Sequence, residues 1–261
     1  MDAVTVIDTE ARRFAAVLAD TPPAARCPTC PEWNADDLLW HLTEVHLFWG
    51  AILATGATTD AAVEQIEAAK PARPADTAGL LELRASATAA LLAQLSALPD
   101  DEPRWTWWDA DQTVGFTRRM QTHEATMHRV DAELTAGLPI SPIATNVATA
   151  GVSHCIDVMW GWLPDWATHT AAAVVALEAT DTDWRRLLEV GRWTGTGPES
   201  GNSFDEPIGR PAASDAEPTA TVRGTAQDLD LWAWTRGGEV ELTGDDTALA
   251  AMNALVANGH E

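Results

Sequence analysis

Glu124 and His128 lie four residues apart in a stretch whose apolar residues recur at helical spacing. Residues three and four apart share one face of a helix, so this carboxylate and imidazole should point into the stripe that includes Phe116 and Met127. Buried ionisable side chains are tolerated when they are paired or bind a metal. The stretch therefore predicts a metal site, with Asp131 as an acceptor that supports one of the ligands.

A further imidazole, His41, occupies the inward stripe of another predicted helix upstream. Asn34 and Asp37 form a capping pair that marks the start of this helix and hence the phase of His41. A Glu or His four residues from another His is also common on solvated helices, where it needs no metal. We favour a metal because both helices place His on an apolar stripe, and because catalytic zinc commonly takes three His and carboxylate ligands with one open position. The predicted ligands are His41, Glu124 and His128.

The composition favours small molecules as ligands. The 261 residues carry a formal net charge of -23, and 46% of them are hydrophobic. Nucleic acids and anionic membranes bind basic surfaces, so neither is an expected partner. No apolar run is long enough to span a bilayer and no export signal is visible, which predicts a cytoplasmic protein. The sequence indicates no oligomeric state.

Two of the three cysteines, Cys27 and Cys30, have the spacing of half a zinc knuckle or of a redox pair. No second pair with this spacing follows, which argues against a four-cysteine structural zinc. A reducing cytoplasm would keep both thiols free. We expect a structural or incidental pair, with a regulatory disulfide as the alternative.

Amphipathic helical patterns fill the first part of the chain, and β-rich runs fill the second. Four helical patterns predict a four-helix bundle, and a fifth leads out of it towards Pro164. The predicted fold class is α+β with two domains, residues 1–163 and 164–261. The polar stretch 194–218 is expected to be a loop or mobile hairpin insert, with a disordered connector favoured over a gate to a cleft. The end of the chain is expected to run strand, helix, strand, helix. The predicted helices cover residues 4–20, 34–54, 77–98, 114–136 and 148–162, and the predicted strands 171–178, 184–193, 220–223 and 239–243.

Over its whole length the sequence resembles the mycothiol-dependent maleylpyruvate isomerase family. The residues that carry the resemblance are Cys30-Pro-Glu-Trp33, Asp37-Leu38, His41-Leu42, Glu124, His128, Arg129 and Asp131, followed by 222–229, Arg236 and 244–245. The resemblance implies a DinB-like metal-binding four-helix bundle and a small sterol-carrier-like C-terminal domain. It also assigns zinc, or another divalent metal, to His41, Glu124 and His128.

The same resemblance implies an enzyme that presents mycothiol as a thiolate nucleophile. In isomerisation the thiolate would add to a cis double bond, the resulting single bond would rotate, and elimination would return the trans isomer. Arg236 would then hold a substrate carboxylate, with Arg223 a second candidate for substrate binding. His46 and His123 are additional imidazoles that could move a proton.

Other functions fit the same residues. A mycothiol S-transferase would direct the same nucleophile at an electrophile and release the adduct. A non-catalytic metal- or ligand-binding protein is the alternative from another class. Hydrolysis by zinc-bound hydroxide would need no thiol, with Glu44 or Asp131 as the base. The expected partners are a small thiol and an electrophilic substrate.

Overall fold

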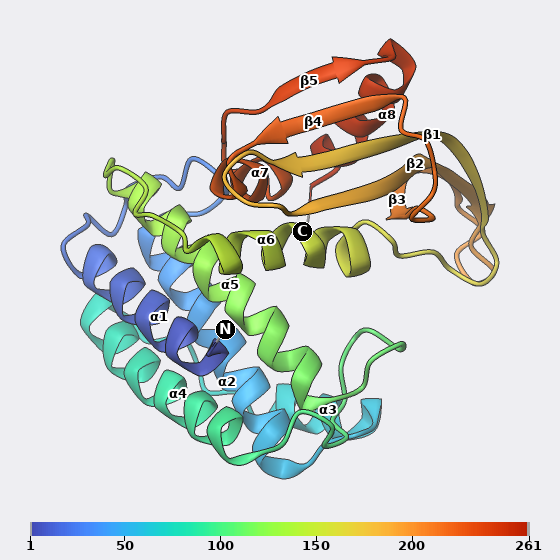
Figure 1. Cartoon of the computed structure of the whole chain (residues 1–261). Coiled ribbons are helices and arrows are strands. Elements are labelled where there is room, and N and C mark those ends of the chain that lie inside the picture. Colours follow the sequence, from blue (N-terminus) through green and yellow to red (C-terminus); the bar gives the residue numbers. More distant parts are fainter. Residues whose placement is uncertain (1, 260–261) are drawn as a thin grey trace. The chain divides into compact units, whose positions relative to one another are not determined.

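The computed structural model describes residues 2–259 of a chain that forms two compact units, Met1–Ser141 and Pro142–Glu261 (Figure 1). The first unit is helical, and the second combines helices with a sheet. The predicted α+β fold class is therefore confirmed. The domain boundary expected at Pro164 lies further along the chain than the division between the units, because α6 (Thr145–His154) packs on α7 (Ala226–Ala233).

Four long helices form the bundle of the first unit. They are α1 (Ala3–Ala19), α2 (Ala35–Thr55), α4 (Thr77–Ala97) and α5 (Val114–Thr135). The most extensive packing between helices is that of α2 with α4 and of α1 with α5. Apolar side chains from these helices, including Phe14, Leu38, Ile52 and Leu91, are fully buried between them. Their burial is the main favourable term that holds the bundle together.

Side-chain caps set where the two helices with predicted ligands begin. The Asn34 side chain accepts from the Asp37 backbone N–H at 3.0 Å, and the Asp37 carboxylate accepts from the Asn34 N–H at 3.0 Å. The predicted capping box of α2 is thus confirmed. The Thr113 side chain caps α5 by accepting a hydrogen bond from the Phe116 backbone N–H. Because each helix starts at a defined residue, the face of the helix that carries His41 or Glu124 is defined as well.

A short helix, α3 (Asp60–Ala68), follows α2 and was not predicted from the sequence. It contributes only Val63 to the buried core, with Ile66 packed against it. Nine residues with so narrow an apolar face give little periodic signal. The helix begins at Thr59, whose side chain accepts from the Ala62 backbone N–H.

The second unit contains a five-stranded sheet of order β3-β2-β1-β4-β5. Its strands are β1 (Thr168–Ala179), β2 (Arg185–Thr196), β3 (Ser203–Pro211), β4 (Ala220–Gly224) and β5 (Glu241–Gly244). Only β1 and β4 pair in parallel among the described strands. Helix α8 (Asp246–Ala257) packs on β1, β2 and β3, and the π-helical turn η1 (Cys155–Met159) extends α6.

The disordered connector expected over residues 194–218 is wrong for much of that stretch, whereas the alternative of a hairpin agrees with the structure. Residues 203–211 form β3, which pairs antiparallel with β2. Ile208 is fully buried and Phe204 stacks on Trp193. Apolar residues therefore alternate along β3 with the polar residues that make this stretch look like a loop in the sequence. Two prolines in this strand are tolerated because it lies at the edge of the sheet.

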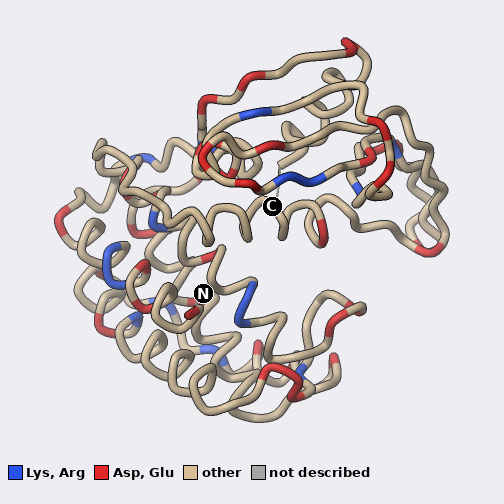
Figure 2. Tube along the Cα trace, viewed as in Figure 1, with Lys and Arg blue, Asp and Glu red and all other residues tan. Residues whose placement is uncertain are grey.

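Acidic residues are distributed along both units, and basic residues are fewer in each (Figure 2). This distribution accounts for the net charge of -23 without concentrating it in one segment. Among the described helices, none combines the length and the apolar character needed to cross a membrane.

Candidate metal centre

His41 on α2 and Glu124 and His128 on α5 converge in the bundle. Their candidate ligand atoms all lie within 4.8 Å of one another. The Glu124 Oε1 atom is 3.3 Å from His41 Nε2 and 3.2 Å from His128 Nε2. The structure thus brings together the three residues predicted from the helical stripes. Their role as metal ligands stays a prediction.

Asp131 supports His128 from the side away from this cluster. Its Oδ2 atom lies 2.9 Å from His128 Nδ1, and its Oδ1 atom accepts a hydrogen bond from the Thr29 hydroxyl at 2.6 Å. In the neutral imidazole, a carboxylate at Nδ1 favours the tautomer that carries its proton there, which leaves Nε2 as the atom that a metal ion could bind. The predicted position of Asp131 beside a ligand agrees with this geometry.

Trp33 forms a wall beside the two imidazoles. Its ring centroid is 4.6 Å from that of His41 and 6.4 Å from that of His128. The side chain of His41 is one-third exposed, that of Glu124 one-quarter exposed and that of His128 about one-tenth. The cluster is therefore open to small molecules on the His41 side. Sequence reasoning gave Trp33 no role at the site, although its place directly before the Asn34 cap was a usable signal.

The charges of this cluster are strongly coupled. Burial alone would raise the pKa of Glu124, but His128 and His41 outweigh it and hold that pKa well below its usual range. Burial likewise opposes the charged form of His128, yet Glu124 and Asp131 raise its pKa to about 9. Nearby opposite charges thus dominate over desolvation. The negative charges of Glu124 and Asp131 hold a proton on His128, and a divalent cation bound at the cluster could balance those charges in place of the proton.

His46 and His123 lie outside this cluster of three ligand atoms. His46 is fully buried on α2, and its Nδ1 lies 2.9 Å from the Thr88 hydroxyl. Burial, with a contribution from Arg84, lowers the pKa of His46 well below its ordinary value. Burial, with a contribution from Arg119, lowers the pKa of His123 to about 4. Both imidazoles are therefore neutral near neutral pH, and their role in proton transfer stays a prediction.

The two predicted arginines belong to the second unit. Arg236 follows α7, where its Nη1 donates to the Trp234 carbonyl at 2.7 Å and its backbone N–H donates to the Leu231 carbonyl at 2.7 Å. Arg223 lies on β4, half exposed, with its Nε 3.5 Å from a Glu178 carboxylate oxygen. Substrate binding by either arginine stays a prediction.

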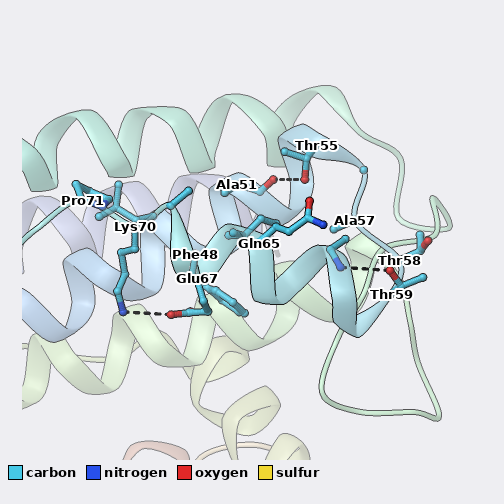
Figure 3. Close-up of a pocket in the computed structure, with 15 residues that line it drawn as sticks. Phe48, Ala51, Thr55, Ala57, Thr58, Thr59, Gln65, Glu67, Lys70 and Pro71 are labelled. Atoms are coloured by element: carbon cyan, nitrogen blue, oxygen red, sulfur yellow. Dashed lines mark hydrogen bonds and ion pairs between the residues drawn. The ribbon is translucent and has the colours of Figure 1, made fainter.

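A groove between α2 and α3 is separate from the predicted ligands (Figure 3). Its volume is about 570 Å³, and its apolar lining includes Phe48 and Ile66. Lys70 lies at this groove and pairs with Glu44 at 2.7 Å and with Glu67 at 3.3 Å. None of the three predicted metal ligands lines it, so this groove is not the metal centre.

The protein thus combines a helical bundle, which holds a cluster of two histidines and one glutamate, with a following α+β unit. Residues 4–133 match the family model described as the mycothiol maleylpyruvate isomerase N-terminal domain. The chain belongs to the mycothiol-dependent maleylpyruvate isomerase family.

Solved structures support the same fold over nearly the whole chain. The chain resembles the crystal structure of the mycothiol-dependent maleylpyruvate isomerase with a TM-score of 0.59 and 14% identity, and that of a histidine-to-alanine mutant of that enzyme with a TM-score of 0.60 and 13% identity. Each match covers 94% of this chain and 93% of the other. At this identity the likeness shows a shared fold. No curated protein matches the chain.

Proposed function

We propose that this protein is a zinc-dependent enzyme that uses mycothiol as a nucleophile to isomerise an electron-poor cis double bond. Membership of the mycothiol-dependent maleylpyruvate isomerase family supports the thiol and the reaction class. The observation that carries the proposal is the convergence of His41, Glu124 and His128 within 4.8 Å. Two imidazoles and one carboxylate are a ligand set typical of catalytic zinc.

The residues around the cluster fit a bound divalent cation. His128 has its Nδ1 held by Asp131, so its Nε2 is free to act as a ligand beside Glu124. His41 is partly exposed, which leaves an approach for a small thiol. When bound, the ion would supply positive charge that lowers the pKa of a thiol in its open position and keeps it as a thiolate at neutral pH.

The protein's own side chains would orient this site. Asp131 keeps the proton of His128 on Nδ1, and the Thr29 hydroxyl holds Asp131 in place. The Trp33 ring covers one side of His41 and would limit the access of water there. A fixed imidazole tautomer and a shielded approach are the contributions that a protein makes to such chemistry.

On the substrate, the thiolate would add to one carbon of the cis double bond and leave a carbanion stabilised by a neighbouring carbonyl. Rotation about the new single bond and elimination of the same thiolate would return the trans isomer, so no thiol is consumed. An S-transferase would share the addition step but release the adduct and consume one thiol for each turnover. Thiol consumption therefore distinguishes the two reactions.

The test is elemental analysis of the purified protein followed by calorimetric titration with mycothiol. We expect one zinc per chain, and thiol binding that is lost when zinc is removed. Glu124→Gln should lose both, whereas Glu44→Gln, on α2 at the Lys70 pair, should keep both. Zinc retained at full stoichiometry by Glu124→Gln would contradict the ligand assignment. Zinc binding without thiol binding would contradict the thiol chemistry.

A further inference from the structure

A tight loop directly before α2 holds both cysteines of the first unit. The Cys27 backbone N–H donates to the Trp33 carbonyl at 3.0 Å, and the Trp33 N–H donates to the Cys30 carbonyl at 2.8 Å. An antiparallel bridge between Arg26 and Asn34 closes the loop just outside these bonds. The proposed function uses neither thiol, although the loop ends at the cap of the helix that carries a predicted ligand.

The Cys30 thiol is close enough to Cys27 to be the main influence on the pKa of Cys27. Cys27 is 1% exposed, whereas Cys30 is partly exposed. The contact with Cys30 lowers the pKa of Cys27 to about 5 against the opposing effect of burial. The pair thus combines a stabilised thiolate with a neighbouring sulfur that small molecules can reach, which is the arrangement of reactive dithiols.

A continuous series of contacts leads from this pair to the predicted metal centre. The Cys27 sulfur is 3.3 Å from the Thr29 hydroxyl, which donates to Asp131 at 2.6 Å. The other Asp131 oxygen lies 2.9 Å from His128 Nδ1. No other cysteine in the described residues has this position, since Cys155 is buried in the second unit.

We propose that Cys27 and Cys30 are a reversible dithiol–disulfide site, oxidised by a low-molecular-weight disulfide, whose state is transmitted through Thr29 and Asp131 to His128. The pair is a redox site independently of any metal. The transmission to His128 rests on the proposed function, because its effect is on metal affinity.

The oxidation proceeds by two exchange steps. Cys30 passes its proton to the Cys27 sulfur, attacks one sulfur of the disulfide RSSR and releases RS⁻, which takes up that proton. The Cys27 thiolate then attacks the Cys30 sulfur of the mixed disulfide and releases the second RS⁻, which is protonated by water. Two electrons leave the dithiol, and one RSSR becomes two RSH.

Oxidation removes negative charge from the neighbourhood of Asp131. The new bond also brings the two sulfurs to about 2 Å from each other, which shifts the Cys27 sulfur relative to Thr29. Both changes weaken the support that Asp131 gives to a cationic centre at His128. Loss of such an outer partner typically costs 10–100-fold in metal affinity. The oxidised protein should therefore bind zinc about tenfold more weakly than the reduced protein.

The redox site is tested by equilibrating the full chain in buffers of reduced and oxidised glutathione, followed by alkylation in denaturant and intact-mass measurement. We expect a transition from three alkylated cysteines to one, with the loss of two hydrogen atoms in the unalkylated mass. Cys155→Ser should keep the transition, and Cys30→Ser should abolish it. Alkylation of all three cysteines in every buffer would overturn the proposal, as would an unchanged transition in Cys30→Ser.

The transmission is tested by measuring Zn²⁺ affinity, with glutathione removed, for the reduced and oxidised wild type and for Thr29→Val. Glu124→Gln in both states corrects for any zinc held by the thiols themselves. We expect the wild-type states to differ by about tenfold and the Thr29→Val states to agree. A disulfide that leaves affinity unchanged overturns the transmission alone. Absence of zinc binding in both states overturns the proposed function, while the mass measurement still decides the redox site.

Discussion

Two sets of polar side chains in the first unit differ in what surrounds them. In the partnered set, Thr29, Asp131 and His128 form hydrogen bonds in sequence. In the unpartnered set, the guanidinium nitrogens of Arg84, both amide atoms of Gln121 and the His46 Nε2 have no hydrogen-bond partner among the described residues. The partnered set fixes one imidazole in one orientation, as a binding site needs. Burial of a polar residue is therefore a weaker sign of a site than the partners it meets.

The two sets also differ in what they contribute to the free energy of unfolding. A buried donor or acceptor without a partner costs about 1–3 kcal/mol, and more for a charged group. Arg84 packs over the Phe14 ring at 4.5 Å, which compensates part of that cost. Burial lowers the pKa of Arg84 to about 9, so its guanidinium is still charged at neutral pH. The following experiments separate the two sets.

Replacement of a residue in the partnered set should have the largest effect. His128→Ala removes a predicted ligand together with the partner of Asp131, so we expect zinc affinity to fall by more than the roughly 100-fold that losing an outer partner can cost. Elemental analysis after dialysis measures it. His169→Ala, on β1 of the second unit, is the control that should leave zinc content unchanged. Equal zinc in both variants would contradict the distinction between the sets.

Asp131→Asn should give the next largest effect. The amide keeps the shape of the side chain but lacks the negative charge that supports His128, so zinc affinity should drop about 10–100-fold with near-normal folding. Competition with a chelator of known affinity measures this loss. Asp20→Asn, at the exposed end of α1, should show none. A wild-type affinity in Asp131→Asn would mean that hydrogen-bonding shape alone supports the site.

Replacement of a residue in the unpartnered set should stabilise the fold. Arg84→Met removes a buried charge while filling similar volume, so we expect the free energy of unfolding to rise by about 1–4 kcal/mol. Urea denaturation of the metal-free protein measures this change. Arg12→Met, at an exposed ion pair with Asp8, should change it by less than about 1 kcal/mol. A loss of stability in Arg84→Met would show that bound water or an anion satisfies the guanidinium.

His46 should contribute the smallest effect, a pH dependence of stability. Its folded pKa is depressed below the unfolded value near 6.5, so the unfolded chain binds a proton that the folded chain does not. Stability is therefore lost as pH falls below 6.5, by up to about 1.4 kcal/mol per pH unit. Urea denaturation of wild type and His46→Gln between pH 7 and pH 5 compares the slopes, with His169→Gln as the control. Identical slopes in wild type and His46→Gln would contradict this assignment.

The sequence predicted the elements that place the three candidate ligands, because each depends on local signals. The Asn34 and Asp37 cap set the phase of α2, and apolar spacing set that of α5. Thr29 could not be predicted as a partner of Asp131, because the two are 102 residues apart and a loop residue has no periodicity. Trp33 was missed for a similar reason. These contacts arise from the path of the loop before α2, which hydrogen bonds set and spacing does not reveal.

Strand β3 marks another limit of local signals. Its apolar residues are interleaved with acidic residues and prolines, and composition over a long window averages out that alternation. The pairing of β3 with β2 determines its structure, and pairing is a non-local property. Tertiary context can thus override a polar composition when one face of a strand is buried.

Helix α5 carries two of the three predicted ligands and is buried along most of its length, including Ala125, Val130 and Glu133. A helix with so little free surface tolerates few substitutions, because nearly every change meets packed neighbours. Evolutionary or engineered changes in substrate preference are therefore more accessible elsewhere. The exposed Asp109 and Ala110 in the loop before α5 are positions where sequence can vary without disturbing the helix. Directed-evolution libraries for new substrates should therefore sample that loop and leave α5 constant.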